Sequence, residues 1–144
     1  MRHAELAGEP ALIALTMLGR AEVNLERRDY PLAAREIERA FELADKSGDQ
    51  LGVAEARRLA ALLAYRQGDY TRARSEAEAA REVARAQDSA LLSAECAGVA
   101  ALAARASGDA PAADQLRAEA TTGYRALGAE SLLARLDDAW SDPA

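Results

Sequence analysis

The chain of 144 residues contains few of the residues that build reactive or metal-binding sites. It has one cysteine, Cys96, and one histidine, His3. A single cysteine excludes a disulfide within the chain, and Cys96 cannot form a zinc site unaided. The sequence therefore predicts no metal and no other cofactor.

Long apolar runs and an excess of basic charge are also missing. The longest mostly apolar stretch, residues 10–18, is too short to span a membrane, and the N-terminus lacks the pattern of a signal peptide. The formal net charge of −6 disfavours duplex DNA and anionic membranes as partners. We expect a cytoplasmic protein that binds neither nucleic acid nor membrane.

Catalytic motifs are absent as well. The sequence has no Gly-rich phosphate loop, no His-Glu zinc pattern and no nucleophile elbow. Cys96 lies inside a predicted helix beside Ala94 and Ala97, which favours a buried thiol over a nucleophile. Acidic pairs such as Glu36 and Glu38 diverge around a helix and do not converge on a substrate. We predict that the protein is not an enzyme.

Alanine dominates what is present: 38 of the 144 residues are Ala, whereas Phe and Trp occur once each. Ala, Leu, Arg and Glu are strong helix formers and β-branched residues are scarce, so the composition predicts an all-α fold. A core made largely of Ala requires backbones that approach each other closely, because Ala cannot fill wide gaps.

Turn-forming residues recur at a spacing of 40. One series is Arg28-Asp29-Tyr30, Gly68-Asp69-Tyr70 and Gly108-Asp109-Ala110. A second series, in step with the first, is Gly8-Glu9, Gly48-Asp49, Asp88-Ser89 and Gly128-Ala129. Two interleaved series with one period indicate a repeat of helix, short turn, helix and short turn.

The period predicts seven helices in a single domain, 1–144, with repeats at about 8–47, 48–87 and 88–127. First helices are expected at about 10–27, 51–67 and 90–107, second helices at about 30–46, 70–87 and 110–126, and a closing helix at about 129–140. Because the turns are only a few residues long, successive helices should be antiparallel neighbours.

Local chemistry agrees with these boundaries. The glycines expected to end helices with positive φ are Gly48, Gly68, Gly108 and Gly128, and the expected N-caps are Asp29, Asp69 and Asp109. Pro31 and Pro111 suit the first turns of second helices, and Pro10 suits the start of the first helix.

Alanines recur where paired helices should cross. They share three repeat positions: Ala21, Ala61 and Ala101; Ala33, Ala73 and Ala113; Ala40, Ala80 and Ala120. Larger residues there would cost about 1–3 kcal/mol each by overpacking.

The two ends of the chain carry different expectations. Residues 1–7 align with the tail of a second helix, so we expect them to be frayed and the chain to be, or to descend from, a piece of a longer array. Residues 129–140 place Leu132, Leu133 and Leu136 on one face, which predicts a lid with Trp140 packed beneath it.

The second repeat, from Ala54 to Ala73, resembles a tetratricopeptide repeat, most closely in the turn Tyr65-Arg-Gln-Gly-Asp-Tyr70. The 40-residue spacing resembles the long-helix variant found in sensor arms of large bacterial transcription activators and related signalling proteins. The resemblance covers nearly the whole chain. It implies a right-handed superhelical array of antiparallel helix hairpins, an α-solenoid, whose concave wall is made by the first helix of each hairpin.

In such proteins the concave wall holds a peptide or protein segment. Carried over position by position, the wall consists of Leu15, Leu18, Glu22, Leu25, Glu26, Glu55, Arg58, Leu62, Tyr65, Arg66, Glu95, Leu102 and Arg105, with Gly98 at a wall position that has no side chain. Leu15, Leu18 and Leu62 could instead simply pack on neighbouring helices. The resemblance therefore implies a protein-binding or peptide-binding scaffold. The alternative is a ligand-sensing or self-association arm of a bacterial regulator, in which a small molecule or a second copy occupies the groove.

Overall fold

The structure, a computed structural model, describes the backbone of residues 2–142 and the side chains of residues 9, 10 and 12–142. These residues form seven helices and no strand, which confirms the predicted all-α class and the number of helices. The helices are α1 (Arg2–Glu26), α2 (Tyr30–Lys46), α3 (Gln50–Arg66), α4 (Tyr70–Ala86), α5 (Ala90–Ala106), α6 (Ala110–Leu127) and α7 (Glu130–Ser141).

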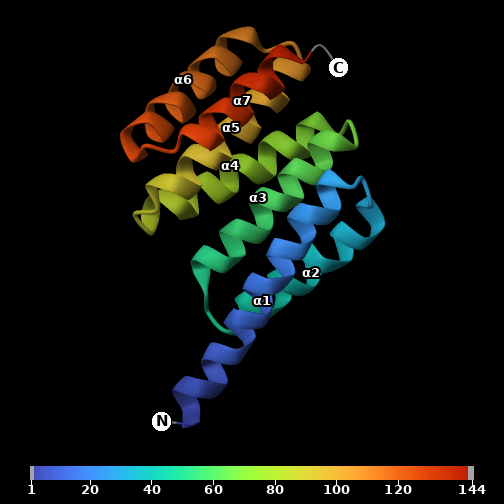
Figure 1. Cartoon of the computed structure of the whole chain (residues 1–144), viewed down its shortest axis with the longest axis vertical. Helices are drawn as coiled ribbons and strands as arrows, with labels where there is room; N and C mark the ends of the chain where they lie inside the picture. The colour runs from blue at the N-terminus through green and yellow to red at the C-terminus, as the bar shows by residue number, and fades with distance from the viewer. Residues whose placement is uncertain (1, 143–144) are drawn as a thin grey trace.

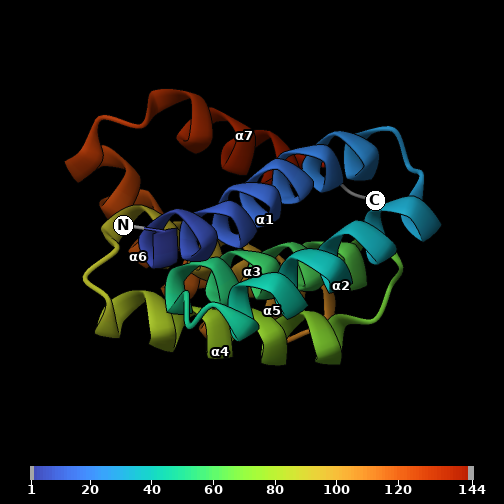
Figure 2. The ribbon, with the colours of Figure 1, turned by 90° about the horizontal axis from the view of Figure 1, so that it is seen from below.

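Each helix packs against the next one in the chain, and the molecule progresses from α1 and α2 at one end to α6 and α7 at the other (Figure 1). The odd-numbered helices also touch in succession, α1 with α3, α3 with α5 and α5 with α7. Among the described residues, the backbones of the even-numbered helices do not approach one another closely, but Arg81 on α4 forms an ion pair with Glu119 on α6. Figure 2 shows α1 and α7 on one side of the molecule and α4 on the opposite side.

The turns have a regularity finer than the 40-residue period. A residue with positive φ stands at every twentieth position, namely Arg28, Gly48, Gly68, Asp88, Gly108 and Gly128. The four glycines adopt the predicted conformation, which costs residues with a Cβ about 1–2 kcal/mol. Arg28 and Asp88 adopt it without being glycine, with φ of 63° and 56°.

The helix starts are capped as predicted. The side chain of Asp69 accepts a hydrogen bond from the backbone N–H of Arg72 at 3.2 Å, and Asp29 and Asp109 cap α2 and α6 in the same way. Pro31 and Pro111 lie in the first turns of those helices. Asp49 and Ser89 cap α3 and α5, so the punctuation residues of the second series also serve as N-caps.

The prediction for the first helix is wrong at its N-terminal end. The helix α1 begins at Arg2 and contains Pro10 in its interior, so Pro10 does not start it and the backbone of residues 2–9 belongs to the same helix. Met1 lies outside the described residues. The residues before Pro10 include Ala, Glu and Leu, which favour helix strongly. The helix therefore continues through Pro10 although proline has no backbone N–H to donate. Figure 1 shows this end of α1 extending beyond the other helices.

The core is built on the predicted alanines. All nine have exposed fractions of 0–1% in the structure. Helices also approach closely at two glycines that the sequence pattern did not reveal. A Cβ added to Gly123 would lie 2.9 Å from Cβ of Ala94, and one added to Gly52 would lie 3.0 Å from Cβ of Ala44. Small residues therefore set the separation between the helices, as a core of Ala requires.

The closing helix α7 packs as a lid, as predicted. Leu136 is buried, and Leu132, Leu133 and Trp140 are partly buried against α5 and α6. The guanidinium carbons of Arg105 and Arg117 lie 4.8 Å and 4.6 Å from the centre of the Trp140 indole ring. Two cation–π contacts therefore hold the end of α7, in addition to its apolar face.

Candidate binding groove

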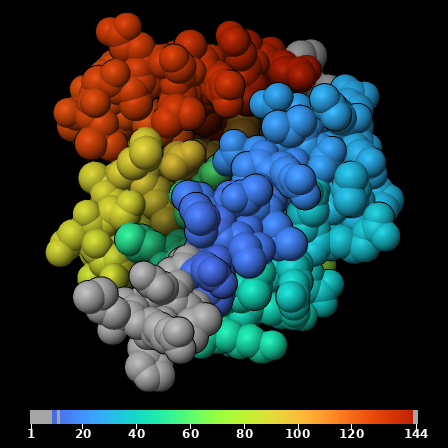
Figure 3. Space-filling view, turned by 60° about the horizontal axis from the view of Figure 1, so that its bottom comes forward, coloured from blue at the N-terminus to red at the C-terminus, as the bar shows by residue number. Residues whose placement is uncertain are grey.

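A hollow with a volume of about 800 Å³, here named the central groove, runs along the layer of odd-numbered helices. Figure 3 shows it as the recess between the surface of α1, in blue, and that of α7, in red. The residues that line it are Glu22, Leu25, Glu26, Arg28, Tyr30, Arg58, Leu62, Tyr65, Arg66, Tyr70, Glu95, Gly98, Val99, Leu102, Tyr124, Leu132, Arg135, Leu136, Asp138, Ala139 and Asp142.

All four tyrosines of the chain line the central groove. The rings of Tyr65 and Tyr70 lie 5.7 Å apart at an angle of 50°. Tyr124 is buried, and burial, together with the nearby carboxylate of Glu95, raises the pKa of its phenol. Burial likewise raises the pKa of Tyr65. These two phenols are therefore neutral at physiological pH and can donate hydrogen bonds.

The floor of the groove is apolar. Leu25, Leu102 and Leu136 are buried, and Leu62 is half-buried. At Gly98, an added Cβ would lie 3.6 Å from Cδ1 of Leu136 and 3.9 Å from the Tyr124 hydroxyl. The missing side chain therefore leaves room between α5 and α7 that a larger residue would occupy.

A buried charge cluster forms one wall of the groove. Arg58 on α3 is only 7% exposed. Its Nη2 donates to Oε1 of Glu22 on α1 at 2.6 Å and to Oε2 of Glu55 at 3.2 Å. Its Nη1 lies 3.6 Å from Oε2 of Glu95 on α5. One cation thus joins three successive odd-numbered helices, and three carboxylates against one guanidinium leave a formal surplus of two negative charges.

Burial and charge act in opposite directions on this cluster. Burial alone would lower the pKa of the Arg58 guanidinium, but Glu95, Glu55 and Glu22 outweigh it and the pKa lies above its ordinary value. Burial raises the pKa of Glu95, Arg58 opposes that rise, and the other two carboxylates add to it. The Nε of Arg58 is buried without a hydrogen-bond partner among the described residues. Hydrogen bonds therefore form only on the side of the guanidinium that is directed toward the carboxylates.

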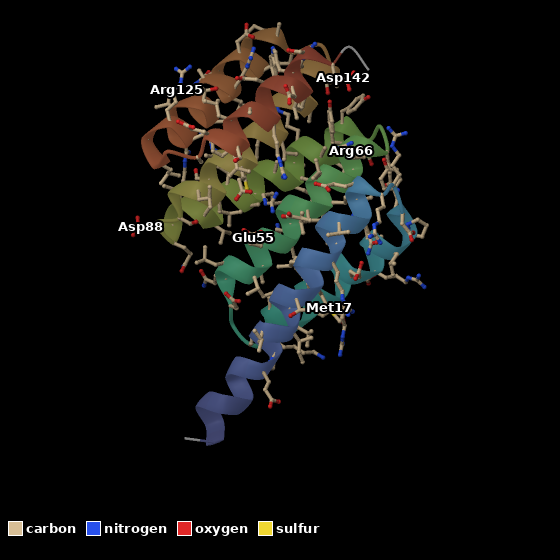
Figure 4. The ribbon with its side chains drawn as sticks, viewed as in Figure 1. Met17, Glu55, Arg66, Asp88, Arg125 and Asp142 are labelled. Carbon is tan, nitrogen blue, oxygen red and sulfur yellow. The ribbon has the colours of Figure 1, made fainter. Side chains whose placement is uncertain are left out.

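Charges of both signs surround the rest of the groove. Figure 4 places Arg66 and Asp142 on the same side of the molecule, Glu55 near its middle, and Asp88 and Arg125 at its edge. Glu26, Asp138 and Asp142 line the groove together with Arg28, Arg66 and Arg135. Outside the charge cluster the lining is therefore balanced in charge.

Most of the residues predicted for the concave wall come together in the central groove. Those that line it are Glu22, Leu25, Glu26, Arg58, Leu62, Tyr65, Arg66, Glu95 and Leu102. The unsubstituted wall position, Gly98, lines it as well. Glu55 does not line the hollow but contacts Arg58, which does.

Three predicted wall residues lie elsewhere. Leu15 is 65% exposed and does not line the groove, and Leu18 is buried in the core between α1, α2 and α3. Leu18 thus follows the alternative of packing on neighbouring helices. Arg105 donates a short hydrogen bond to the backbone carbonyl of Trp140, and its guanidinium stacks on the indole ring. Through these two contacts Arg105 holds α7 in place, and its guanidinium is not available at the wall of the groove.

Sequence reasoning missed several lining residues outside the first helices. Tyr30 and Tyr70 are the first residues of α2 and α4, and both line the groove. Their shared repeat position predicts only a turn. Tyr124 reaches the groove from the end of α6, and α7 contributes Leu132, Leu136 and their neighbours. The equal spacing of Tyr30 and Tyr70 is a signal for them, and the apolar face of residues 129–140 predicts a lid but not that this lid lines the groove.

The single cysteine lies in the core and does not line the groove. Cys96 is fully buried, as predicted, and burial raises the pKa of its thiol to about 12. Among the side chains that the structure describes, those of residues 9, 10 and 12–142, no three His, Cys, Asp or Glu are grouped so that they could hold a metal ion. In the same part of the chain, no helix has the length and apolar character needed to cross a membrane.

Comparison with known proteins finds no family model, no curated protein and no solved structure that matches the chain. The resemblance to the tetratricopeptide family therefore remains a prediction from the residues of the sequence.

Proposed function

We propose that the chain is a tetratricopeptide-like α-solenoid of the cytoplasm that binds a peptide or protein segment in its central groove and performs no catalysis. The observation that carries the proposal is the convergence of all four tyrosines on one apolar-floored groove. Tyrosine is enriched among the residues that contribute most to binding energy, because its ring buries a large area while its hydroxyl still forms hydrogen bonds.

Two features support the solenoid part of the proposal. The backbones of the odd-numbered helices approach one another in succession, whereas the even-numbered helices of the described chain meet only through side chains, such as Arg81 on α4 and Glu119 on α6. Such an arrangement is expected when a row of hairpins curves with its first helices on the inside. The positive-φ residue at every twentieth position gives each turn the same backbone form. Identical turns favour a constant rotation between hairpins, as in repeat proteins.

The groove suits a segment that carries apolar anchors beside a basic side chain. Leu62, Leu102 and Leu136 provide apolar surface. The surplus of negative charge around Arg58 lies beside this surface, where Glu22 retains about half of its side-chain exposure. A lysine or arginine of the partner could therefore pair with Glu22 while a neighbouring apolar side chain occupies the floor.

Helices that are already packed form the groove, so binding requires little ordering of this chain. The free-energy cost of association then falls mainly on the partner segment. A catalytic role has less support, because Glu95 is held 3.6 Å from Arg58 and is not presented as a free base.

Selection from a displayed peptide library tests the proposal. We expect peptides that share an apolar residue near a basic one, and we expect Leu62→Ala with Tyr65→Ala to weaken their binding at least tenfold in fluorescence anisotropy. Leu91→Ala is the matched control, because Leu91 is exposed on α5 and lies outside the groove. Far-UV circular dichroism checks that both variants remain helical. Failure to enrich any peptide, or equal binding by the two variants, would contradict the proposal.

A small-molecule sensor arm is the second candidate. It is favoured by the groove volume of about 800 Å³, which falls within the range of ligand pockets. A metabolite that occupies the groove should raise the melting temperature of the wild type but not that of the Leu62→Ala, Tyr65→Ala variant. Thermal shifts across a metabolite library, compared with the peptide selection, distinguish the two candidates.

A further inference from the structure

Helix α1 carries two stripes of residues with the same spacing on opposite sides. Ala14, Leu18, Ala21 and Leu25 are buried against α2 and α3. Leu12, Thr16, Gly19 and Val23 repeat that spacing two residues earlier, which corresponds to a rotation of about 200° around the helix. All four are exposed, Leu12 at 64% and Val23 at 47%. We name these four residues the outer stripe.

The positions equivalent to the outer stripe are covered elsewhere in the chain. Forty residues later, Ala56, Leu59 and Leu63 are buried in a cluster shared with Ile37 and Ala40 of α2. Forty residues further on, Leu92 and Cys96 pack against Ala80 and Ala84 of α4, and Ala103 packs against Ala73. A helix therefore covers this face of α3 and of α5. No helix in the part of the chain that the structure describes covers the same face of α1.

Opposite charges stand at the two ends of the outer stripe. Glu9 precedes it and Arg27 follows it, 18 residues apart, or about five helical turns, so both lie on the same side. Arg27 continues the helical pattern, because its backbone N–H donates to the carbonyl of Val23 at 3.0 Å. An antiparallel copy of α1 would place its Arg27 beside Glu9, and its Glu9 beside Arg27.

We propose that two copies of this chain associate through the outer stripe, with their α1 helices antiparallel and Glu9 of each copy paired with Arg27 of the other. In this arrangement Leu12 of one copy meets Val23 of the second, and Thr16 meets Gly19. The space around Gly19 is open, because an added Cβ would meet no atom within 4 Å. The two backbones can therefore approach closely at the centre of the pair.

The hollow beside the outer stripe enlarges the contact. It has a volume of about 470 Å³ and is formed with Leu32 and Glu36 of α2. The helices meet over roughly 27 Å, which gives a smaller interface than a standard stable complex. The dimer is therefore weak and forms in a concentration-dependent way. Glu22 and Leu25 of the central groove lie on other sides of α1, so the association leaves the groove open and does not depend on the function proposed for it.

Sedimentation equilibrium from micromolar to millimolar protein tests the proposal. The wild type should rise from the monomer mass of 15.3 kDa toward twice that value. Gly19→Glu should weaken association at least tenfold, because it places two charges at the centre of the pair, while its far-UV spectrum is unchanged. Leu91→Glu, on the exposed start of α5, is the control and should associate like the wild type. A wild type that stays monomeric, or a dimer indifferent to Gly19→Glu, overturns the proposal.

Charge reversal tests the antiparallel arrangement. Glu9→Arg and Arg27→Glu should each weaken self-association, because each places like charges together at both ends of the pair. An equimolar mixture of the two variants should form heterodimers with wild-type affinity, since both of its charge pairs are then opposite. Neither variant should fold differently, because both side chains are exposed. If the mixture stays monomeric at concentrations where the wild type dimerises, the arrangement is wrong.

Discussion

Arg58 on α3 donates a hydrogen bond of 2.6 Å to Glu22 on α1, across 36 positions of the sequence. The same guanidinium lies 3.6 Å from Glu95 on α5, so it connects three successive helices of the groove wall. Ion pairs on protein surfaces usually contribute little to stability, but this cation is 7% exposed and its removal would leave the partly buried Glu95 without its cationic partner.

Replacing Arg58 by Met should therefore destabilise the fold by about 3 kcal/mol at neutral pH. Loss of Arg58 removes the attraction that opposes the rise in the pKa of Glu95, so this pKa rises further above its ordinary value of 4.5. At pH values between the pKa of Glu95 in the unfolded chain and its higher pKa in the folded variant, the folded state holds a proton that the unfolded state has lost. Stability therefore falls as the pH rises through this window. Urea denaturation should show a smaller defect at mildly acid pH.

The control for this prediction is the double variant Arg58→Met with Glu95→Gln, which leaves no partly buried carboxylate at position 95. It should recover part of the stability and lose most of the added pH dependence. An equal defect at acid and neutral pH in the single variant would show that lost packing, and not the charge of Glu95, dominates.

The two positive-φ residues that are not glycine offer a second prediction. Asp88 has a φ of 56° and is exposed at the turn between α4 and α5. Asp88→Gly should raise the unfolding free energy by up to about 1 kcal/mol, because glycine adopts this conformation without strain and the relief exceeds its entropic cost. Thermal or chemical denaturation measures the change.

Gly68→Ala is the matched substitution in the opposite direction. Gly68 has a φ of 84° and no atom would lie within 4 Å of an added Cβ, so crowding plays no part. A loss of about 1 kcal/mol is expected from backbone strain alone. If Gly68→Ala is neutral, conformational preference does not control these turns.

The sequence predicts the architecture more fully than it predicts the residues of the groove, for a physical reason. Turn residues, N-caps and small core residues act locally, so a fixed spacing predicted the nine buried alanines and the capping aspartates. The role of Arg105 depended instead on where α7 docks, which is a contact between helices distant in sequence. The indole of Trp140 competes for the guanidinium, and the predicted wall position is lost.

Burial along α1 shows the same limit. Leu15 and Leu18 differ by one helical turn and have equal hydropathy, yet Leu15 is 65% exposed and Leu18 is buried. A repeat pattern assigns both to one face, because three positions correspond to about 300°. Whether a residue near the edge of a face is covered depends on neighbouring helices, and among the described helices α1 contacts only α2 and α3.

A third prediction concerns the alanine crossings. Ala61 is fully buried and packs in a cluster with Ala77, Val99 and Ala101. Ala61→Leu should destabilise the fold by about 1–3 kcal/mol, because the added atoms would force α3 and α5 apart. Ala118→Leu, at an exposed position on α6, is the control and should change stability by less than about 0.5 kcal/mol. Comparable losses in the two variants would mean that the crossings tolerate larger side chains.

The last prediction uses the only tryptophan of the chain as a reporter of the lid. Leu136 is the buried residue of α7 and contacts the open position at Gly98, so Leu136→Ala removes much of the apolar surface that docks the helix. We expect the emission of Trp140 to shift to longer wavelength, because the indole leaves its place between Arg105 and Arg117 and becomes hydrated. Far-UV circular dichroism should change little, since the other six helices remain packed. Leu127→Ala, exposed at the end of α6, should leave the emission unchanged. If Leu136→Ala instead lowers the whole helical signal together with the shift, α7 is not a separable lid but part of one cooperative unit with α5 and α6.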